Sequence, residues 1–447
     1  MANQTDKLPP QNIEAEKSVL GSILIDKESI EKVIDILKYD DFYIRQNQLI
    51  YKAMAELLEK NEPIDILTLT NKLEESGEIE NAGGPAYLTS LLSEVPTSAH
   101  ISNYAKIVQR KKILRDLIDS AHRILELGHQ ENESIDKILD QAEQKLFSVS
   151  QRSLTQEFTH LGEGLTEAFE RLEKLHKGDG SLRGFTTGFV DLDNILAGLQ
   201  RSDLIVLGGR PSLGKTSLAL DIARNVAKKA NVAVGIFSLE MSKDQVIDRI
   251  LSAEAGIGLW KMRTGRLSSS GDFNDFSKIS VALDNLSKIP IFIDDAPSPT
   301  VLQIRAMARR LRAKSNLGLL VVDYLQLVQP RSDIDGYVQQ VTDVANSLKA
   351  LARELNIPVV AVSQLSRAVE ARPDQRPRLS DLRESGGIEQ AADLVLFIHR
   401  EDRVRQGSDR KNIAEIIIAK HRNGPTGAIE LYFDEEEVSF KNLAKNI

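Results

Sequence analysis

A glycine-rich segment has the residue types and spacing of a nucleotide phosphate site. It fits the pattern G-x-x-x-x-G-K-[ST] between Gly209 and Thr216. Glycines let backbone N–H groups close around phosphate oxygens, and the first turn of a following helix offers further unpaired N–H groups. Lys215 suits the β- and γ-phosphates, and the Thr216 hydroxyl suits Mg²⁺. The alternative is an ordinary loop before a helix. The predicted phosphate-binding residues are Gly209, Arg210, Pro211, Ser212, Leu213, Gly214, Lys215, Thr216 and Ser217.

Two carboxylates each follow an apolar run that is typical of a buried strand. Asp323 ends such a run, an arrangement that holds Mg²⁺ and its waters beside Thr216. Glu240 ends another, and an unpaired carboxylate is too costly to bury by chance. We predict that Glu240 orients and polarises the attacking water. A structural ion pair is the alternative.

An amide and a series of arginines follow a third apolar run. Gln364 ends this run, and because an amide both donates and accepts, we predict that it senses the γ-phosphate. Residues 366–387 form a predicted long loop that suits the phosphates of a single nucleic-acid strand. Aromatic platforms are absent from it, so we expect backbone recognition with little sequence preference. The alternative is a solvated loop. Its arginines are Arg367, Arg372, Arg376, Arg378 and Arg383.

A tight turn at residues 420–427 presents two cations, Lys420 and Arg422, between two β-rich runs. A hairpin tip of this kind is able to reach a neighbouring copy's nucleotide site and stabilise transition-state charge, the role of an arginine finger. An isolated subunit is then expected to hydrolyse poorly.

The elements that must position these residues alternate between short apolar runs and helical segments from residue 184 onward. Several runs are continuous in Val, Ile and Leu, which indicates a parallel sheet covered on both faces. Ligands of such sheets bind at the carboxyl ends of the strands. We therefore predict an α/β domain. The candidate strands are residues 204–208, 232–238, 290–294, 319–323, 358–363, 394–399, 413–420 and 429–433.

The first third of the chain has helical periodicity and carries none of this chemistry. Residues 13–92 predict a compact helical domain, with one helix expected around residues 30–37 after an Asp26 cap. Two longer periodic segments, on either side of a polar turn at 128–133, predict a helical hairpin. We predict a helical N-terminal domain over residues 1–150, a linker with a docking helix over 151–183, and the α/β domain over 184–447. The linker helix is expected to pack on its own domain or on a neighbouring copy, because an isolated helix of about 15 residues is marginally stable.

Composition limits the classes of protein further. The 447 residues contain no cysteine, which excludes disulfides, thiolate zinc sites and cysteine nucleophiles. The seven histidines show no metal-ligand spacing. A formal charge of −8 argues against wholesale coating of nucleic acid but allows a local basic groove. No apolar run would span a bilayer and the polar N-terminus lacks a signal-peptide core, so we expect a cytoplasmic protein with no membrane partner.

The assembled motifs resemble those of the DnaB-type hexameric helicases, the bacterial replicative DNA helicases with a RecA-like ATPase motor. The resemblance covers essentially the whole chain and is looser in the N-terminal third. It is most specific in Gly209-Arg210-Pro211-Ser212-Leu213-Gly214-Lys215-Thr216, Phe237-Ser238-Leu239-Glu240-Met241, Val322-Asp323-Tyr324-Leu325-Gln326-Leu327, Val362-Ser363-Gln364-Leu365-Ser366-Arg367, Asp381-Leu382-Arg383-Glu384-Ser385-Gly386 and Lys420-His421-Arg422-Asn423-Gly424.

The resemblance implies a homohexameric ring that encircles single-stranded DNA and moves 5′ to 3′, with ATP and Mg²⁺ at subunit interfaces. Glu240 would be the catalytic base, and Lys420 and Arg422 would act in trans. The linker helix would dock on the adjacent motor domain. The N-terminal domain would bind primase, and a loader protein would open or assemble the ring. The residues expected to track the DNA backbone are Arg367, Arg383, Glu384 and Gly386.

Other classes of protein share part of this pattern. A recombinase of the RecA kind would form an open filament instead of a closed ring, and a clock-type ATPase would carry duplicated motors, which this sequence lacks. A nucleotide-dependent assembly scaffold that hydrolyses nothing would have no use for Glu240 or Arg422. A small-molecule kinase would need a lid segment and an acceptor pocket, and neither is evident in the sequence.

Overall fold

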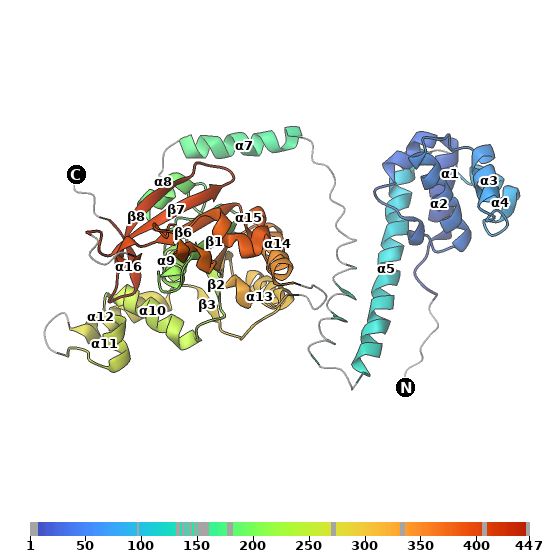
Figure 1. Ribbon diagram of the computed structural model, residues 1–447. Helices are drawn as coiled ribbons and strands as arrows, with labels where there is room; N and C mark the ends of the chain where they lie inside the picture. Colours follow the sequence, from blue (N-terminus) through green and yellow to red (C-terminus); the bar gives the residue numbers. More distant parts are fainter. Residues whose placement is uncertain are drawn as a thin grey trace. The chain divides into compact units, whose positions relative to one another are not determined.

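The computed structural model divides the chain into two compact units, Met1–Leu161 and Gly162–Ile447 (Figure 1). The division falls inside the predicted linker of residues 151–183. The structure describes residues 8–95, 98–130, 161–176, 182–269, 274–330, 336–404 and 409–443, together with isolated positions between 131 and 150. No helix in these ranges is both long and apolar enough to cross a lipid bilayer.

The N-terminal unit is helical, as predicted, and is built around one apolar core. Val19 and Ile23 of α1 and Ile50 and Met54 of α2 are fully buried in it. Gly21 lets α4 approach α1, because a Cβ there would lie 2.4 Å from the Leu91 carbonyl oxygen. Its helices are α1 (Ile13–Ile25), α2 (Arg45–Glu59), α3 (Ile66–Glu75), α4 (Gly84–Ser93) and α5 (Ile101–Gly128), with the 3-10 turns η1 (Lys27–Lys32), η2 (Tyr39–Asp41) and η3 (Ser98–His100).

The helix expected around residues 30–37 is wrong in type, whereas the predicted Asp26 cap and the predicted burial are confirmed. The Asp26 side chain accepts from the Glu28 N–H and the Ser29 hydroxyl, which draws the first turn into the 3-10 helix η1. Ile30, Val33 and Leu37 are nevertheless buried. α5 forms the first arm of the predicted hairpin, and most of the second arm lies outside the described residues.

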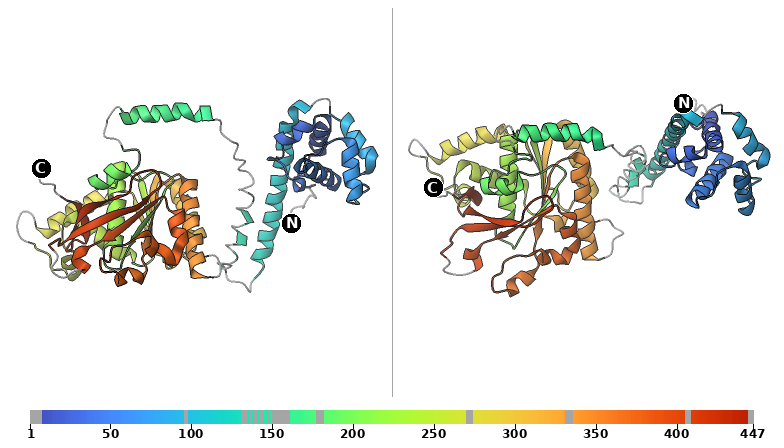
Figure 2. Two further views of the ribbon diagram at one scale, coloured as in Figure 1. Left: turned by 45° about the horizontal axis from the view of Figure 1, so that its top comes forward. Right: turned by 90° about the horizontal axis from the view of Figure 1, so that it is seen from above.

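The C-terminal unit contains one sheet of nine strands in the order β3-β2-β4-β5-β1-β6-β7-β8-β9. The strands from β3 to β6 are parallel, and β7, β8 and β9 continue the sheet as antiparallel neighbours (Figure 2). The predicted α/β class and all eight predicted strands are confirmed. The bounds are β1 (Leu204–Gly209), β2 (Ala233–Ser238), β3 (Ile291–Asp294), β4 (Leu317–Asp323), β5 (Val359–Gln364), β6 (Leu394–His399), β7 (Ile413–His421), β8 (Gly427–Asp434) and β9 (Ser439–Asn442).

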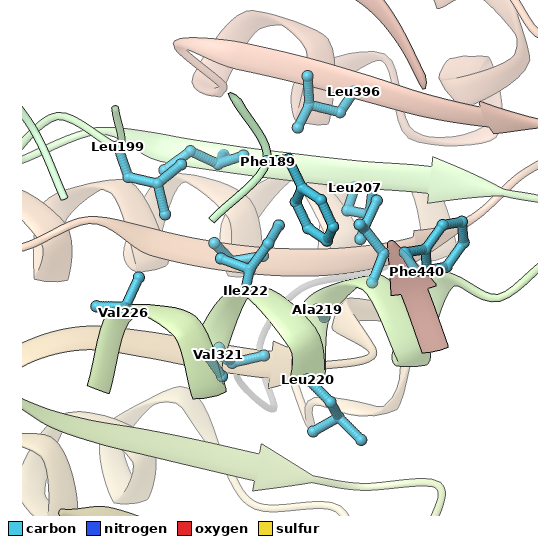
Figure 3. Close-up of a cluster of buried hydrophobic side chains, with 14 of the residues drawn as sticks. Phe189, Leu199, Leu207, Ala219, Leu220, Ile222, Val226, Val321, Leu396 and Phe440 are labelled. Carbon is cyan, nitrogen blue, oxygen red and sulfur yellow. The ribbon is translucent and has the colours of Figure 1, made fainter. Parts of the chain in front are cut away.

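Helices cover both faces of this sheet. Alternate residues of β1 point to opposite faces, so Leu207 joins a core with α8 and α9, and Val206 joins one with α13 and α14. Figure 3 shows Ile222 and Val226 of α9 directed at the first core. The helices of the unit, of which α7 contributes no described side chain to either core, are α7 (Leu161–His176), α8 (Val190–Leu196), α9 (Lys215–Ala230), α10 (Lys243–Ala255), α11 (Leu259–Thr264), α12 (Asp275–Ser287), α13 (Val301–Lys314), α14 (Tyr337–Leu355), α15 (Gly386–Ala391) and α16 (Glu401–Val404).

The predicted long loop at residues 366–387 is wrong as a description of the backbone. It contains the 3-10 helices η5 (Arg367–Ala371) and η6 (Leu379–Ser385), and α15 begins at its end. Asp381 holds the segment together by accepting from the backbone N–H of Arg378 at 2.6 Å and from the Arg372 guanidinium. Local side-chain acceptors of this kind give the chain turns that apolar periodicity does not reveal.

Candidate nucleotide and nucleic-acid site

The glycine-rich segment lies where β1 ends and α9 begins, at the carboxyl edge of the parallel strands. Gly214 caps α9 with a φ of +97°, a conformation that L side chains rarely adopt. A Cβ at Gly214 would also lie 3.0 Å from the Phe440 ring. A glycine is therefore required here both by the backbone conformation and by the packing against β9, and the first N–H groups of α9 face the predicted phosphate position.

Lys215 is half-buried at the start of α9 and is held by its own loop. Its Nζ donates to the Arg210 carbonyl oxygen at 3.1 Å. Burial lowers the pKa of Lys215, while the charges of Asp323 and Glu240 oppose that shift. The Arg210 guanidinium is itself paired with the Glu370 carboxylate of η5, so the segment after β5 touches the phosphate loop.

Asp323 ends β4 with its side chain buried at 4% exposure. Neither of its carboxylate oxygens has a hydrogen-bond partner among the described residues. Burial raises the pKa of Asp323, and the Thr216 hydroxyl and the Lys215 charge act in the opposite direction. An orphaned buried carboxylate next to a hydroxyl fits Mg²⁺, which takes few protein ligands and completes its shell with water and phosphate oxygens. Within the described ranges, no three or more His, Cys, Asp or Glu side chains are placed to hold a metal ion together.

Glu240 lies two residues beyond the end of β2 and is exposed. Its charge acts on the pKa values of both Lys215 and Asp323, which places the three side chains within one electrostatic site. Arg249 of α10 belongs to the same site, because its Nη1 lies 3.5 Å from the Ser217 hydroxyl and burial lowers its pKa. Sequence reasoning missed Arg249, since a single arginine on a helix carries no signal.

Gln364 is brought beside the phosphate loop by the register of the sheet. It pairs with Gly209 across β5 and β1 and is exposed at the same edge. The Gln326 amide donates to the Gln364 carbonyl oxygen at 3.1 Å. A cavity of about 500 Å³ opens here, and it is lined by Arg210, Tyr324, Gln326, Tyr337, Ser363, Gln364, Leu365, Ser366, Asp381 and Leu382. The cavity connects the phosphate loop with the segment that follows β5.

The structure describes the side chains of only some of the predicted nucleic-acid residues. The side chains of Arg367, Arg383 and Glu384 lie outside the described residues, although their backbone belongs to η5 and η6, and Gly386 begins α15. The other three arginines of the segment pair within the protein: Arg372 with Asp381, Arg376 with Glu415 and Arg378 with Asp374. Their charge is thus partly neutralised before any nucleic acid is bound.

Lys420 and Arg422 lie at the opposite edge of the sheet. Lys420 pairs with Val395 near the start of β6, and the Arg422 N–H donates to the Asp393 carbonyl oxygen. β1, which is six residues long, separates this amino edge from the phosphate loop. Its five steps of about 3.3 Å give a separation of about 16 Å between the two edges. That length exceeds the reach of an arginine side chain, so neither cation meets the phosphate loop of its own chain.

Comparisons with known proteins agree over both units. The model of the DnaB-like helicase C terminal domain matches residues 184–442, and that of the DnaB-like helicase N terminal domain matches residues 8–110. The chain is 46% identical over 442 residues to the replicative DNA helicase DnaB of Geobacillus stearothermophilus, covering 99% of this chain and 96% of that protein. It is 45% identical to the replicative DNA helicase DnaC of Bacillus subtilis, covering 98% and 96%.

A solved structure shares the whole architecture. It is described as the structure of a DnaB-like replicative helicase and its interactions with primase, and it is 32% identical to this chain. The TM-score is 0.78, and the match covers 97% of this chain and 100% of the solved one. The helical N-terminal unit and the α/β unit are therefore found together in a known fold.

Proposed function

This chain belongs to the DnaB-like replicative DNA helicase family, and from that premise we propose that it unwinds DNA as a ring of six copies driven by ATP hydrolysis. The ring moves 5′ to 3′ on one strand. The observation that supports this mechanism best is the separation of the predicted catalytic groups onto two edges of one sheet. Lys215, Asp323 and Glu240 lie at the carboxyl edge, and Arg422 lies about 16 Å away at the amino edge. A complete site then needs two copies.

Each group at the carboxyl edge has a part in hydrolysis. The N–H groups of the phosphate loop bind the phosphates, and Lys215 exchanges its bond to the Arg210 carbonyl oxygen for phosphate oxygens. Thr216 and Asp323 would hold Mg²⁺, which supplies charge stabilisation when it is bound. Glu240 takes the proton of the attacking water. Gln364, which pairs with Gly209, senses the γ-phosphate.

The remaining groups complete the cycle. Lys420 and Arg422 enter the neighbouring copy's site and neutralise charge in the transition state. Loss of the γ-phosphate at Gln364 is passed to the segment after β5, whose residues Arg367, Arg383, Glu384 and Gly386 follow the DNA backbone. The N-terminal unit binds primase, a loader protein assembles the ring on DNA, and the protein acts in the cytoplasm.

Strand displacement on forked duplexes tests this function. Forks with a free 5′ tail, a free 3′ tail or both are incubated with Mg²⁺ and ATP, and particle mass is measured in the same buffer. We expect displacement only where a 5′ tail is present, by particles of six copies, and none from Lys215→Ala. A fully active single subunit, hydrolysis indifferent to DNA, or open filaments in place of rings would refute the proposal.

A further inference from the structure

The amino edge of the sheet contains a buried carboxylate that the proposed reaction does not use. Asp393 immediately precedes β6, and its side chain is 4% exposed. One oxygen, Oδ2, accepts from the Leu204 N–H at 2.8 Å and from the Lys349 Nζ at 2.5 Å. The other, Oδ1, accepts from Nη1 of Arg422 at 3.1 Å. The carboxylate thus connects the start of β1, the helix α14 and the β7–β8 turn.

Arg422 is fixed to Asp393 at two points. Its backbone N–H donates to the Asp393 carbonyl oxygen at 2.8 Å, and its guanidinium bonds the carboxylate of the same residue. The Arg422 side chain nevertheless remains 57% exposed. A planar guanidinium held on one nitrogen keeps its other N–H donors in a defined direction, so the exposed face is oriented toward solvent.

Arg422 shares the buried Asp393 carboxylate with a second cation. Lys349 already provides a cation on the same carboxylate, and its Nζ is anchored a second time by the Ser202 carbonyl oxygen at 2.7 Å. The register of β6 and β7 also shifts between Val395 and Leu396, a bulge that turns the chain just before Lys420. Lys420 is held in its turn, because its Nζ donates to the Glu389 carbonyl oxygen at 2.6 Å.

We propose that Asp393, with Lys349 behind it, is the positioning residue for the trans-acting Arg422. Its carboxylate holds the guanidinium in the direction from which it meets the nucleotide of the adjacent copy. This role rests on the proposed function, since it presumes a ring in which Arg422 acts on a neighbour. Asp393 itself touches neither nucleotide nor reacting atoms. Its contribution is to limit the orientations of Arg422 before the transition state forms.

Asp393→Asn tests the role with little change in shape. The new amide oxygen still accepts from the Leu204 N–H, but its NH₂ group then faces Arg422 and cannot accept a hydrogen bond. We expect kcat for DNA-stimulated ATP hydrolysis to fall about 10- to 100-fold, the cost of a misplaced catalytic group, with KM for ATP within about twofold of wild type. Asp221→Asn is the matched control. Asp221 is a buried carboxylate that likewise accepts from a backbone N–H, that of Phe440, and pairs with an arginine, Arg224, and none of these bonds involves Lys349 or Arg422.

Mixed rings separate positioning from misfolding. An Asp393→Asn subunit keeps its phosphate loop, and a Lys215→Ala subunit keeps its Arg422, so a mixture should exceed the summed activity of the two pure variants. A mixture of Asp393→Asn with Arg422→Ala should show no gain, because both lack the same function. The inference is overturned if Asp393→Asn alone hydrolyses within twofold of wild type. It is also overturned if Lys215→Ala restores Arg422→Ala but not Asp393→Asn. If Lys215→Ala restores neither, the trans mechanism of the proposed function has failed.

Discussion

The two edges of the parallel sheet hold charged groups in opposite states. At the carboxyl edge, both oxygens of Asp323 lack partners within the described residues, and Lys215 donates to a carbonyl of its own loop. At the amino edge, the Asp393 carboxylate accepts bonds from Leu204, Lys349 and Arg422. The first edge is therefore incomplete until a ligand arrives, whereas the second is complete within one chain.

This difference has an energetic side. A buried polar group without a partner costs about 1–3 kcal/mol, and such costs are characteristic of sites that exchange them for ligand binding. The Asp393 carboxylate at the amino edge has its hydrogen-bond partners, so this cost does not arise there. The charges at this edge are already ordered, which is how groups that stabilise a transition state avoid reorganising when it forms.

The largest expected effect is the loss of the cation from the amino edge. Arg422→Ala should lower kcat about 10³-fold or more, as for an arginine finger, while ATP still binds. Mixing these subunits with Lys215→Ala subunits should restore part of the hydrolysis. Arg410→Ala is the control, since Arg410 is an exposed arginine that pairs with Glu430. Turnover and nucleotide binding are measured on the same preparations, and failure of every mixing ratio would favour a role within one chain.

A somewhat smaller loss is expected from the carboxyl edge. Glu240→Ala should lower turnover by about 10²- to 10⁴-fold, the usual contribution of a general base, because the attacking water would lose its proton acceptor. ATP affinity should be retained, since Glu240 is exposed and lies beyond the end of β2. Asp244→Asn, at an exposed acid in the first turn of α10, is the control. Near-normal hydrolysis by Glu240→Ala would remove this residue from the mechanism.

The strands and the place of the glycine-rich segment between β1 and α9 were predictable from sequence because their signals are local. Continuous apolar runs give β1 and β4, and β1 ends in the glycine-rich segment while β4 ends on Asp323. β9 was not predicted because the hydrogen bonds that hold it come from a residue distant in the sequence. Asp221 of α9 accepts from the Phe440 N–H at 2.7 Å and from the Ser439 hydroxyl at 3.0 Å.

The amino edge was less predictable for the same reason. The sequence of the turn at residues 420–427 shows two cations. It does not show that the Asp393 carboxylate, itself paired with Lys349, binds Arg422. Arg249 likewise joins the nucleotide site only through the packing of α10 beside α9. The periodicity at residues 30–37 identified the buried side chains correctly, because burial depends on spacing. It misjudged the helix type, because a cap and apolar spacing do not distinguish a short 3-10 helix from an α-helix.

The smallest expected effect is on stability, where the same change should act in opposite directions at the two edges. Asp323→Asn should raise the thermal midpoint of the metal-free protein by about 2–4 °C, roughly 1 kcal/mol, by removing a buried charge without partners. Asp393→Asn should lower it by a similar or larger amount, because Arg422 loses its acceptor and Lys349 loses the negative charge it pairs with.

The stability that Asp323→Asn gains over the wild type should increase with pH. Burial raises the pKa of Asp323 in the folded protein. Below the unfolded-state pKa of about 3.9 the wild-type carboxyl is therefore neutral, and burying it costs little free energy. That stability is lost as the pH rises through the raised folded pKa, and the advantage of Asp323→Asn should appear over the same interval. Thermal unfolding followed from pH 4 to pH 8 without nucleotide measures it. Mg²⁺ with ATP should then stabilise the wild type and not Asp323→Asn. An equal loss of stability at Asp323 and Asp393 would mean that both carboxylates are structural and that the two edges do not differ.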